Sequence, residues 1–319
     1  MTGAWLRFLA IRLAGTAIVL LVLSFGIYCL LYIAPGSVEQ TLLGNRPATE
    51  QTREAVRAQY HLDDPLLLQY GRWLTDAAQG NLGTSIRSGE PVDSAIGARA
   101  GLTLQLAGLG TVLALLLGLP LGVLAALRRG RATDQGIVTL SVAGLSAPPF
   151  AVGLVLLTLL AIRLDWFPVY GAGTGGLDRL WHLVLPALAL AVAGAGLLVR
   201  FTRTALVREL DQDYVVFARA RGLGRTRVLR YALRNCAVPI LTATGLVLTS
   251  ALIGSVLVEV VFALPGLGSL LVDAVSFKDV PVVQGVALLL TLLIALVNLA
   301  VDAAYTAADP RVSLVRRRG

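Results

Sequence analysis

The sequence predicts an all-α integral membrane protein with six transmembrane helices and both termini in the cytoplasm. Of its 319 residues, 56% are apolar and only 14% are charged, whereas an ordinary soluble domain carries about 25% charged residues. The mean hydropathy is +0.77, and the apolar residues come in long stretches without charge rather than at half-buried periods. So little charge excludes a soluble enzyme, because the surface of such an enzyme needs more of it.

Six stretches without Asp, Glu, Lys or Arg are long enough to cross a bilayer, which needs roughly 20 helical residues. They run over 13–38, 101–127, 135–162, 180–199, 235–258 and 280–301. Backbone groups in hydrocarbon must form hydrogen bonds within their own segment, so spans this apolar are predicted to be helices. Breakers such as Pro35 and Gly36 trim the ends of some of them.

The basic residues predict the orientation. Of the 27 basic residues, 18 lie before the first span, between the second and third, between the fourth and fifth, or after the sixth. Short cytoplasmic loops carry an excess of Lys and Arg. Both termini, including a basic tail over 308–319, are therefore predicted to be cytoplasmic. The net charge of +8 follows from this topology, and the dispersed Arg argue against nucleic acid as a partner.

The N-terminal transmembrane helix is expected over 1–34. Arg7 and Arg12 precede its apolar run, as basic residues precede the apolar region of a signal peptide. That region is only about 7 to 15 residues long in a signal peptide, however, and no small-residue cleavage pattern follows closely here. The segment is therefore predicted to remain as a helix.

The segment 35–100 is predicted to be extracytoplasmic and helical. One short amphipathic helix is expected over 49–60, and a second is expected to begin at Asp64 and Pro65, with Asp64 as its cap, and to end at Gly80. The segment either packs as a small cap on the membrane helices or forms a docking surface for an extracytoplasmic partner. The apolar face of the second helix would consist of Leu66, Leu67, Tyr70, Trp73, Leu74 and Ala77.

The other five spans form a predicted core over 101–307. Pro148 and Pro149 interrupt the third span and are expected to bend or break it. A kinked helix can face a translocation path, but Gly and Pro are also frequent in membrane helices in general, and the sequence leaves both interpretations open. The stretch 260–272 is too short to cross a bilayer and is expected to form a re-entrant or surface loop.

The most informative stretch is the cytoplasmic segment 200–236, which carries nine Arg. Asp213 is expected to cap a short helix, which Gly222 and Gly224 end. A second helix is expected from Thr226, with Val228, Leu229, Ala232 and Leu233 along one face. Such a basic helix pair either lies on anionic lipid or binds a partner in the cytoplasm.

This segment resembles the coupling loop, or EAA loop, of importer-type ABC transporter permeases, and in particular their dipeptide/oligopeptide/nickel branch. The pattern of that branch, Tyr-Val-x-x-Ala-Arg-Ala-Lys-Gly-Leu, is matched by residues 214–223 with Arg221 in place of Lys. Val216 and Phe217 replace the Glu and Ala of the general EAA signature. Pro239 lies 17 residues after Gly222, a spacing that also resembles the peptide branch.

Further segments are similar to the same branch and extend the resemblance over nearly the whole chain. They are 80–85 (Gly-Asn-Leu-Gly-Thr-Ser), 146–150 (Ser-Ala-Pro-Pro-Phe), 185–188 (Leu-Pro-Ala-Leu), 259–262 (Glu-Val-Val-Phe), 264–268 (Leu-Pro-Gly-Leu-Gly) and 309–312 (Asp-Pro-Arg-Val). In 80–85, Asn81 replaces the Asp of the family motif. The order and spacing of these segments together argue against chance agreement.

The resemblance implies a type I ABC importer permease fold in a bacterial plasma membrane, with this chain as one half of a pseudo-symmetric dimer. The implied partners are a second permease subunit, for which the family favours a heterodimer, two ABC ATPase subunits, an extracytoplasmic solute-binding protein and the lipid bilayer. The implied cargo is a peptide or a related small solute, and the sequence leaves dipeptides, oligopeptides, nickel chelates, opines and sugars open.

No ATP site is expected on this chain. A P-loop needs Gly-x4-Gly-Lys-Ser/Thr, and the single Lys of the sequence, Lys278, is followed by Asp279. The chain is therefore expected to hold no cofactor, with ATP and Mg²⁺ on the partner ATPases. In the family, these ATPases grip the coupling loops and switch the permease between inward-open and outward-open states. His61 and His182 are the only histidines, so neither a catalytic site nor a metal site is expected.

The candidate site residues follow from the resemblance. It assigns the ATPase-coupling role to Asp213, Tyr214, Ala218, Arg219, Ala220, Arg221, Gly222, Leu223, Arg230 and Arg234. It places Glu259 and Phe262 in the outer gate region. Together with Pro148, Pro149 and Phe150 at the interrupted third span, these two are the candidates for the translocation pathway.

An ion-coupled secondary transporter of a small solute is the alternative, because it shares the span count and the basic loops. Such proteins usually place ionisable residues in mid-membrane, whereas the acids closest to these spans, Glu259 and Asp302, lie at span ends. Backbone carbonyls at broken helices can still bind sodium, so the alternative stays open. A structural scaffold also fits the composition, but it does not explain the coupling-loop pattern.

Overall fold

The computed structural model describes residues 2–33 and 49–308. Within these ranges the chain is a series of helices, and an isolated bridge between Thr84 and Pro91 is the only extended pairing. The motif at 309–312, nearly all of the basic tail and the start of the extracytoplasmic segment lie outside the described residues.

Five of the described helices are long and apolar enough to cross a membrane. They are α1 (Thr2–Ile33), α5 (Val92–Leu127), α8 (Gly176–Leu210), α11 (Ala237–Val261) and α13 (Val280–Ala308). They confirm the predicted helices of the first, second, fourth, fifth and sixth spans. Three of them, α1, α5 and α8, also extend well beyond the stretches without charge.

The third span is broken. It consists of α6 (Ala132–Ser146) and α7 (Pro149–Leu156), whose axes are bent by 102°, and α7 continues into the wider turns of the π-helix η1 (Leu157–Arg163). A residue before proline is driven out of the helical region, and both Ala147 (ψ 124°) and Pro148 (ψ 134°) are extended. The predicted bend is confirmed, and the described residues hold six spans when this pair is counted as one.

The chain divides into two compact units. The central unit consists of Leu104–Leu264 with the two chain ends, and the flanking unit consists of Leu6–Thr103 and Pro265–Leu296. Helices α5 and α13 each contribute residues to both units. The two units are described one at a time below.

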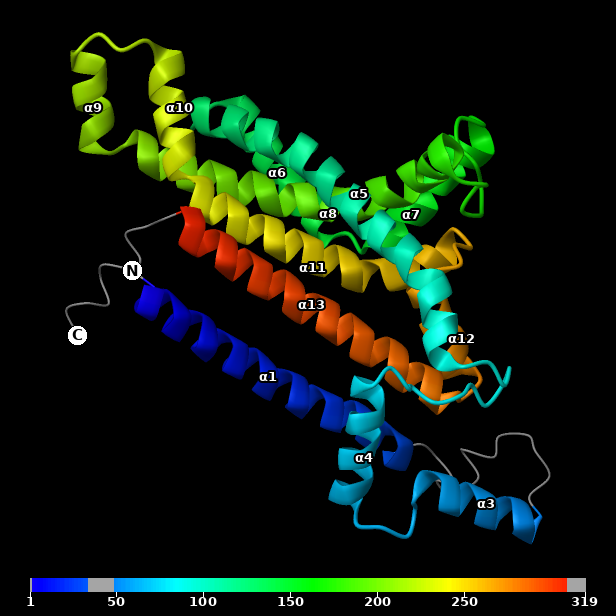
Figure 1. The fold of residues 1–319 in the computed structure, drawn as a ribbon. Coiled ribbons are helices and arrows are strands. Elements are labelled where there is room, and N and C mark those ends of the chain that lie inside the picture. Colours follow the sequence, from blue (N-terminus) through cyan, green and yellow to red (C-terminus); the bar gives the residue numbers. More distant parts are fainter. Residues whose placement is uncertain (1, 34–48, 309–319) are drawn as a thin grey trace. The chain divides into compact units, whose positions relative to one another are not determined.

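In the central unit, α8 packs against α6, α7 and α11 (Figure 1). Its middle is rich in small buried residues, which allow helices to approach closely. A Cβ on Gly196 would lie 2.5 Å from the carbonyl oxygen of Ser141 on α6, and one on Gly194 would lie 2.8 Å from Val247 on α11. Glycine is therefore required at both crossings for lack of space.

In the flanking unit, two short helices precede α5. They are α3 (Glu50–Tyr60) and α4 (Leu66–Ala78), which agree with the two amphipathic helices that the sequence predicts. The predicted cap is wrong, because Pro65 is the N-cap of α4 and makes no side-chain bond. Asp64 forms an ion pair with Arg72 instead, at 2.6 Å. The predicted apolar face is also narrower than expected, since Leu67 is 73% exposed.

A buried amide fastens α4 to α1. The Oε1 atom of Gln69 accepts hydrogen bonds from the hydroxyls of Tyr28, at 3.1 Å, and Tyr32. Its Nε2 atom donates to the carbonyl oxygens of Leu62 at 3.2 Å and Asp64 at 2.8 Å. Every hydrogen-bonding position of the amide is thereby used, so the polar side chain is buried at little cost.

A second polar contact joins the loop before α5 to the link before α13. The buried carboxylate of Asp279 accepts hydrogen bonds from the Ser85 hydroxyl at 2.5 Å and from the backbone N–H groups of Ile86 at 3.1 Å and Arg87 at 3.3 Å. Just before this link, the chain forms α12 (Leu267–Ser276), a helix where a re-entrant or surface loop was expected over part of 260–272.

Candidate functional site

The predicted coupling segment forms two short helices beyond the end of α8. They are α9 (Asp213–Ala220) and α10 (Arg225–Asn235), and α10 leads directly into α11. Within the central unit, both helices project past the ends of α6, α8 and α11 (Figure 1). The helix, turn and helix predicted from the sequence are therefore present.

The start of α9 differs from the prediction. Gln212 is the N-cap, in extended conformation and without a side-chain hydrogen bond, and Asp213 is the first residue of the helix rather than its cap. In the first turn the charge of Asp213 still faces the positive end of the helix dipole. Its contribution to α9 is thus electrostatic.

The end of α9 requires glycine. Gly222 has φ +77°, in the left-handed region that side chains disfavour. Its N–H donates to the carbonyl of Arg219 at 2.9 Å, and that of Leu223 donates to the carbonyl of Ala218 at 3.1 Å, which together form a Schellman motif. Gly224 has a different role from the one predicted, because it is the N-cap of α10 with φ −63°.

A triangle of hydrogen bonds holds the two helices on α8. The hydroxyl of Tyr214 donates to Oε2 of Glu209 at 2.8 Å, and Nδ2 of Asn235 donates to the same oxygen at 3.2 Å and to the Tyr214 hydroxyl at 3.1 Å. Burial raises the pKa of Tyr214, and so does its hydrogen bond to Glu209. The phenol therefore keeps the proton that it donates.

The sequence assigned no role to Glu209 or Asn235. Both belong to the segment 200–236, which resembles the coupling loop of the family. Their position could have identified them, because Glu209 lies in the last turn of α8 and Asn235 is the last residue of α10. A polar residue at each end of such a segment is a candidate to tie the ends together.

Beneath α10 lies a small apolar core. Ala232 and Cys236 are buried against Leu206 of α8 and Ala126 of α5. Burial raises the pKa of the Cys236 thiol to about 11, with the Glu209 charge as the second cause. This cysteine is accordingly a neutral packing residue at physiological pH.

The other side of the two helices is exposed. Val216 and Phe217 on α9 are 60% and 68% exposed, and Tyr231 on α10 is 52% exposed. Exposed aromatic side chains next to arginine are typical of surfaces that bind a protein partner. We name as the coupling surface the exposed side chains of Val216, Phe217, Arg219, Arg221, Arg230, Tyr231 and Arg234.

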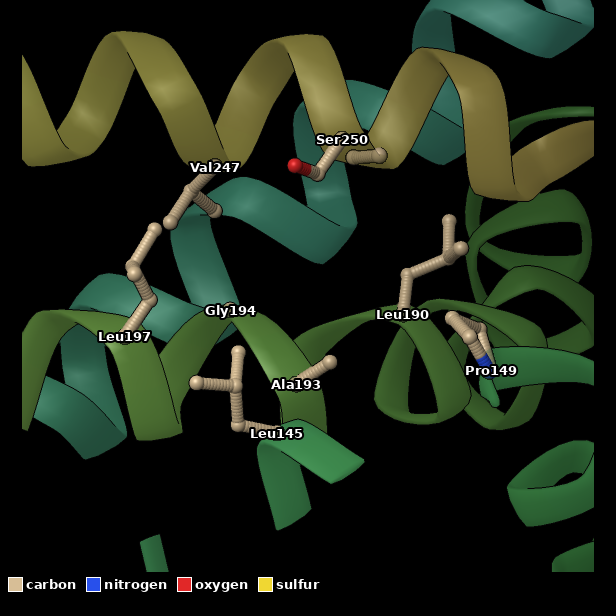
Figure 2. A pocket seen from close by; sticks show the side chains of 9 residues that line it. Leu145, Pro149, Leu190, Ala193, Gly194, Leu197, Val247 and Ser250 are labelled. Atoms are coloured by element: carbon tan, nitrogen blue, oxygen red, sulfur yellow. The ribbon is translucent and has the colours of Figure 1, made fainter. Parts of the chain in front are cut away.

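Among the candidates for the pathway, Pro149 lines a cavity of about 70 Å³ at the break between α6 and α7. Figure 2 shows Leu145 and Pro149 facing residues of α8 and α11 across this cavity. Its lining is apolar apart from the hydroxyl of Ser250. The other lining residues are Leu190, Ala193, Gly194, Leu197, Val247 and Ala251.

The remaining candidates lie elsewhere in the central unit. Phe150 is 37% exposed and Phe262 is buried, with its ring 3.0 Å from the position that a Cβ on Gly153 of α7 would take. Glu259 is fully buried, and its carbonyl oxygen accepts the N–H of Leu264 at 2.8 Å. The structure thus places Pro149 at the cavity and Phe262 next to α7. Phe150, Glu259 and Phe262 do not line the cavity.

Comparison with protein families gives two matches. The model described as the binding-protein-dependent transport system inner membrane component matches residues 118–314. The model of the N-terminal part of such membrane components matches residues 5–107. Together they span both compact units.

Curated relatives match over nearly their whole length. The chain is 39% identical over 308 residues to the glutathione transport system permease protein GsiC of Salmonella paratyphi A, which covers 96% of this chain and 99% of that protein. It is 40% identical over 292 residues to the oligopeptide transport system permease protein AppB of Bacillus subtilis, covering 89% and 92%.

Among solved structures, inward-facing conformations of the MetNI methionine ABC transporter share the fold. One chain aligns with a TM-score of 0.57 and 18% sequence identity, covering 67% of this chain and 96% of that chain. At this identity the similarity concerns the fold alone.

Proposed function

The chain belongs to the family of binding-protein-dependent transport system inner membrane components, and we propose that it forms half of the translocation pathway of an ATP-driven importer for peptides. The relatives are named for glutathione and oligopeptide transport, which supports di- and oligopeptides, or a related small solute, as the cargo. The other half would be a second permease subunit, and an extracytoplasmic binding protein would deliver the cargo.

The observation that carries this proposal is the coupling surface. Its exposed Val216 and Phe217 occupy the two positions at which the chain departs from the general EAA signature. The turn at Gly222 and the hydrogen bonds that join Tyr214 to Glu209 and Asn235 hold α9 at the end of α8. A rigid helix with an exposed apolar and basic face suits a groove on an ATPase subunit, which would carry the ATP and Mg²⁺ that this chain has no P-loop to bind.

The translocation pathway would pass the break between α6 and α7. Pro148 and Pro149 interrupt the helix there, and the cavity at Pro149 is apolar. A broken helix changes its angle more easily than a continuous one, since fewer backbone hydrogen bonds hold it straight. Movement at this break would let α6 and α7 respond differently when the partner ATPases close.

The test is a pull-down of the tagged chain from gently solubilised native membranes, with the co-purifying polypeptides identified and ATPase activity measured. We expect a second permease and ATP-binding subunits. Arg219→Glu and Arg221→Glu should each reduce the yield of ATPase subunits several-fold, because charge reversal opposes a complementary surface. Arg163→Glu, at the exposed last residue of η1 and so at the opposite end of the third span from the α5–α6 turn, is the matched control and should leave the yield unchanged.

Two results would contradict the proposal. If all three variants give the normal complex yield, the arginines of α9 face lipid headgroups rather than a protein. If the chain purifies alone in several detergents and without ATPase activity, an ion-coupled secondary transporter becomes the better interpretation. Uptake driven by an ion gradient in proteoliposomes would then be the decisive assay.

A further inference from the structure

A partly buried ion pair joins α6 to α8 within the central unit. Arg203 of α8 donates from Nε to Oδ1 of Asp134 at 2.6 Å and from Nη2 to Oδ2 at 2.7 Å. The side chain of Asp134 is only 3% exposed and that of Arg203 is 29% exposed. Bidentate arginine–carboxylate pairs combine strength with a fixed orientation, so this contact sets both the distance and the angle between the two helices at this point.

The carboxylate of Asp134 has a third donor. The backbone N–H of Gly130 donates to Oδ2 at 2.9 Å, and Gly130 has φ +78° in the turn that leads from α5 into α6. Asp134 therefore holds the connecting turn and the α8 side chain at once. Asp134 lies in the first turn of α6, so a displacement of this contact displaces the helix.

The two helices that this pair joins lead to the two parts of the proposed mechanism, namely the coupling surface after α8 and the cavity at the end of α6. Arg203 lies on the same continuous helix as Leu210, directly before α9 and the coupling surface. At the far end of α6, Leu145 lines the cavity next to the break at Pro149. A rigid helix transmits displacement along its axis, and α6 has 15 residues, or about 22 Å at 1.5 Å per residue.

We propose that the Asp134–Arg203 pair is a positioning contact that passes movement of the coupling surface to α6 and so to the cavity wall at the helix break. This inference rests on the proposed function, because it requires partner ATPases to move α9. The pair stays closed during the cycle and makes α6 move with α8. Without the pair, α6 still packs on α8 at Gly196, but its first turn is no longer fixed to α8, and less of the movement reaches the cavity wall.

The chain provides a matched control. Arg129 and Asp211 also join the α5–α6 turn to the end of α8, with Nη1 and Oδ2 at 2.7 Å. Their side chains are 58% and 62% exposed, and exposed pairs contribute little because water and salt screen them. The first pair joins α6 to α8, and the second joins the turn just before α6 to the C-cap of α8. They lie in the same region and differ in burial and in bidentate geometry.

The experiment uses the complete complex with its binding protein in proteoliposomes. Uptake of a radiolabelled tripeptide and ATP hydrolysis are measured together, which gives the ATP hydrolysed per molecule taken up. Asp134→Asn should raise this ratio about tenfold with hydrolysis within about twofold of the wild type. Asp211→Asn should leave it unchanged.

A second variant separates coupling from folding. Asp134→Asn leaves a partly buried arginine without its carboxylate, which destabilises, whereas removing both charges of such a pair is often neutral. Asp134→Asn with Arg203→Met keeps an acceptor for Gly130 and leaves no unpaired charge. We expect this double variant to melt within a few degrees of the wild type and still to show the raised ratio.

The outcomes are distinguishable. A double variant with the wild-type ratio would overturn the inference and leave the proposed function intact. An equally raised ratio in Asp211→Asn would also overturn it, because the effect would then not depend on the buried, bidentate geometry of the Asp134–Arg203 pair. A wild-type complex without ATP-dependent uptake would contradict the proposed function itself, and this inference with it.

Discussion

Position 222 requires glycine because of its backbone conformation and not because a side chain would lack space there. It has φ +77°, and apart from atoms of Gly222 itself and of its two neighbours in the chain, no atom lies within 4 Å of the position that a Cβ would take. An L-residue in the left-handed region costs roughly 1–2 kcal/mol, which the Schellman motif at the end of α9 would have to absorb. The turn therefore responds to substitution through its backbone alone.

We predict that Gly222→Ser and, more strongly, Gly222→Val raise the ATP hydrolysed per molecule of cargo, because the strained turn displaces α9 from its fixed position. The chain should still insert and reach the membrane in normal amount. Proteoliposomes of the assembled complex give the ratio, and quantitative immunoblotting of membranes gives the amount. Uptake fully coupled to hydrolysis in Gly222→Val would show that the turn has no part in coupling.

Gly224→Ser is the matched control, since Gly224 has φ −63° and also has open space around it. Serine is a favourable N-cap residue, so this variant should leave α10 and the coupling ratio unchanged. An equal effect of serine at both positions would indicate that the whole turn, rather than the left-handed residue, is sensitive.

At single residues, the sequence predicted helix ends better than helix starts. A glycine after a helical run has one common role, and Gly222 fulfils it. Asp64 and Asp213 were both predicted as caps, but a neighbouring residue takes that place in each case. Aspartate is favourable both at the N-cap and in the first turn, so sequence alone cannot separate positions one residue apart.

Contacts distant in sequence were not predictable at all. The Glu209–Asn235 hydrogen bond joins residues 26 positions apart, and the Ser85–Asp279 bond joins residues 194 apart. Helical periodicity describes only neighbours within a few residues. The motif around Ser85 was recognised from its resemblance to the family, and its contact with Asp279 gives that motif a structural role.

On the scale of elements, the contact between the loop at Ser85 and the link at Asp279 should stabilise the flanking unit. We predict that Asp279→Asn lowers the melting temperature of the purified chain, because asparagine retains one acceptor oxygen and presents N–H groups to the remaining donors. Leaving a buried donor without an acceptor costs about 1–3 kcal/mol. Asp273→Asn on the exposed side of α12 is the control and should melt as the wild type does.

Thermal unfolding in detergent, followed by circular dichroism, measures both variants. Ser85→Ala should show a smaller decrease than Asp279→Asn, since it removes one of the three donors. Equal melting temperatures in Asp279→Asn and the wild type would mean that the loop and the link are held by apolar packing alone, including that of Leu82 on the cluster around Val92 and Val286.

Most membrane helices were predictable because length and apolar composition determine them. The break at Pro148 and Pro149 was also predictable, since proline acts through covalent geometry. The π-helical turns of η1 and the helix α12 were not predicted. A π-helix has no distinct sequence pattern, and the 10-residue α12 falls below the length at which apolar composition alone identifies a helix.

On the scale of the whole molecule, the sequence did not indicate that residues 6–103 and 265–296 form one compact unit. Charge and hydropathy divide the chain into consecutive segments, whereas this unit combines two distant ones. The predicted orientation in the membrane, by contrast, depends on a property of the whole sequence, the distribution of its basic residues.

We predict that reporter fusions at Asn81 and Arg131 lie on opposite sides of the membrane. Asn81, in the loop before α5, should report the outside, and Arg131, in the turn between α5 and α6, should report the cytoplasm. Both residues are exposed, and a single long helix, α5, lies between them. A phosphatase reporter that is active outside and a fluorescent protein that folds inside should give opposite signals at the two positions.

The same assay tests the proposed coupling, because α9 must lie on the side where ATP is found. A fusion at Thr226 in α10 should therefore match the one at Arg131. An inverted pair of signals would place α9 and α10 outside, where no ATPase could bind the coupling surface. Matching signals at Asn81 and Arg131 would instead mean that α5 does not cross the membrane, contrary to its 36 residues of largely apolar helix.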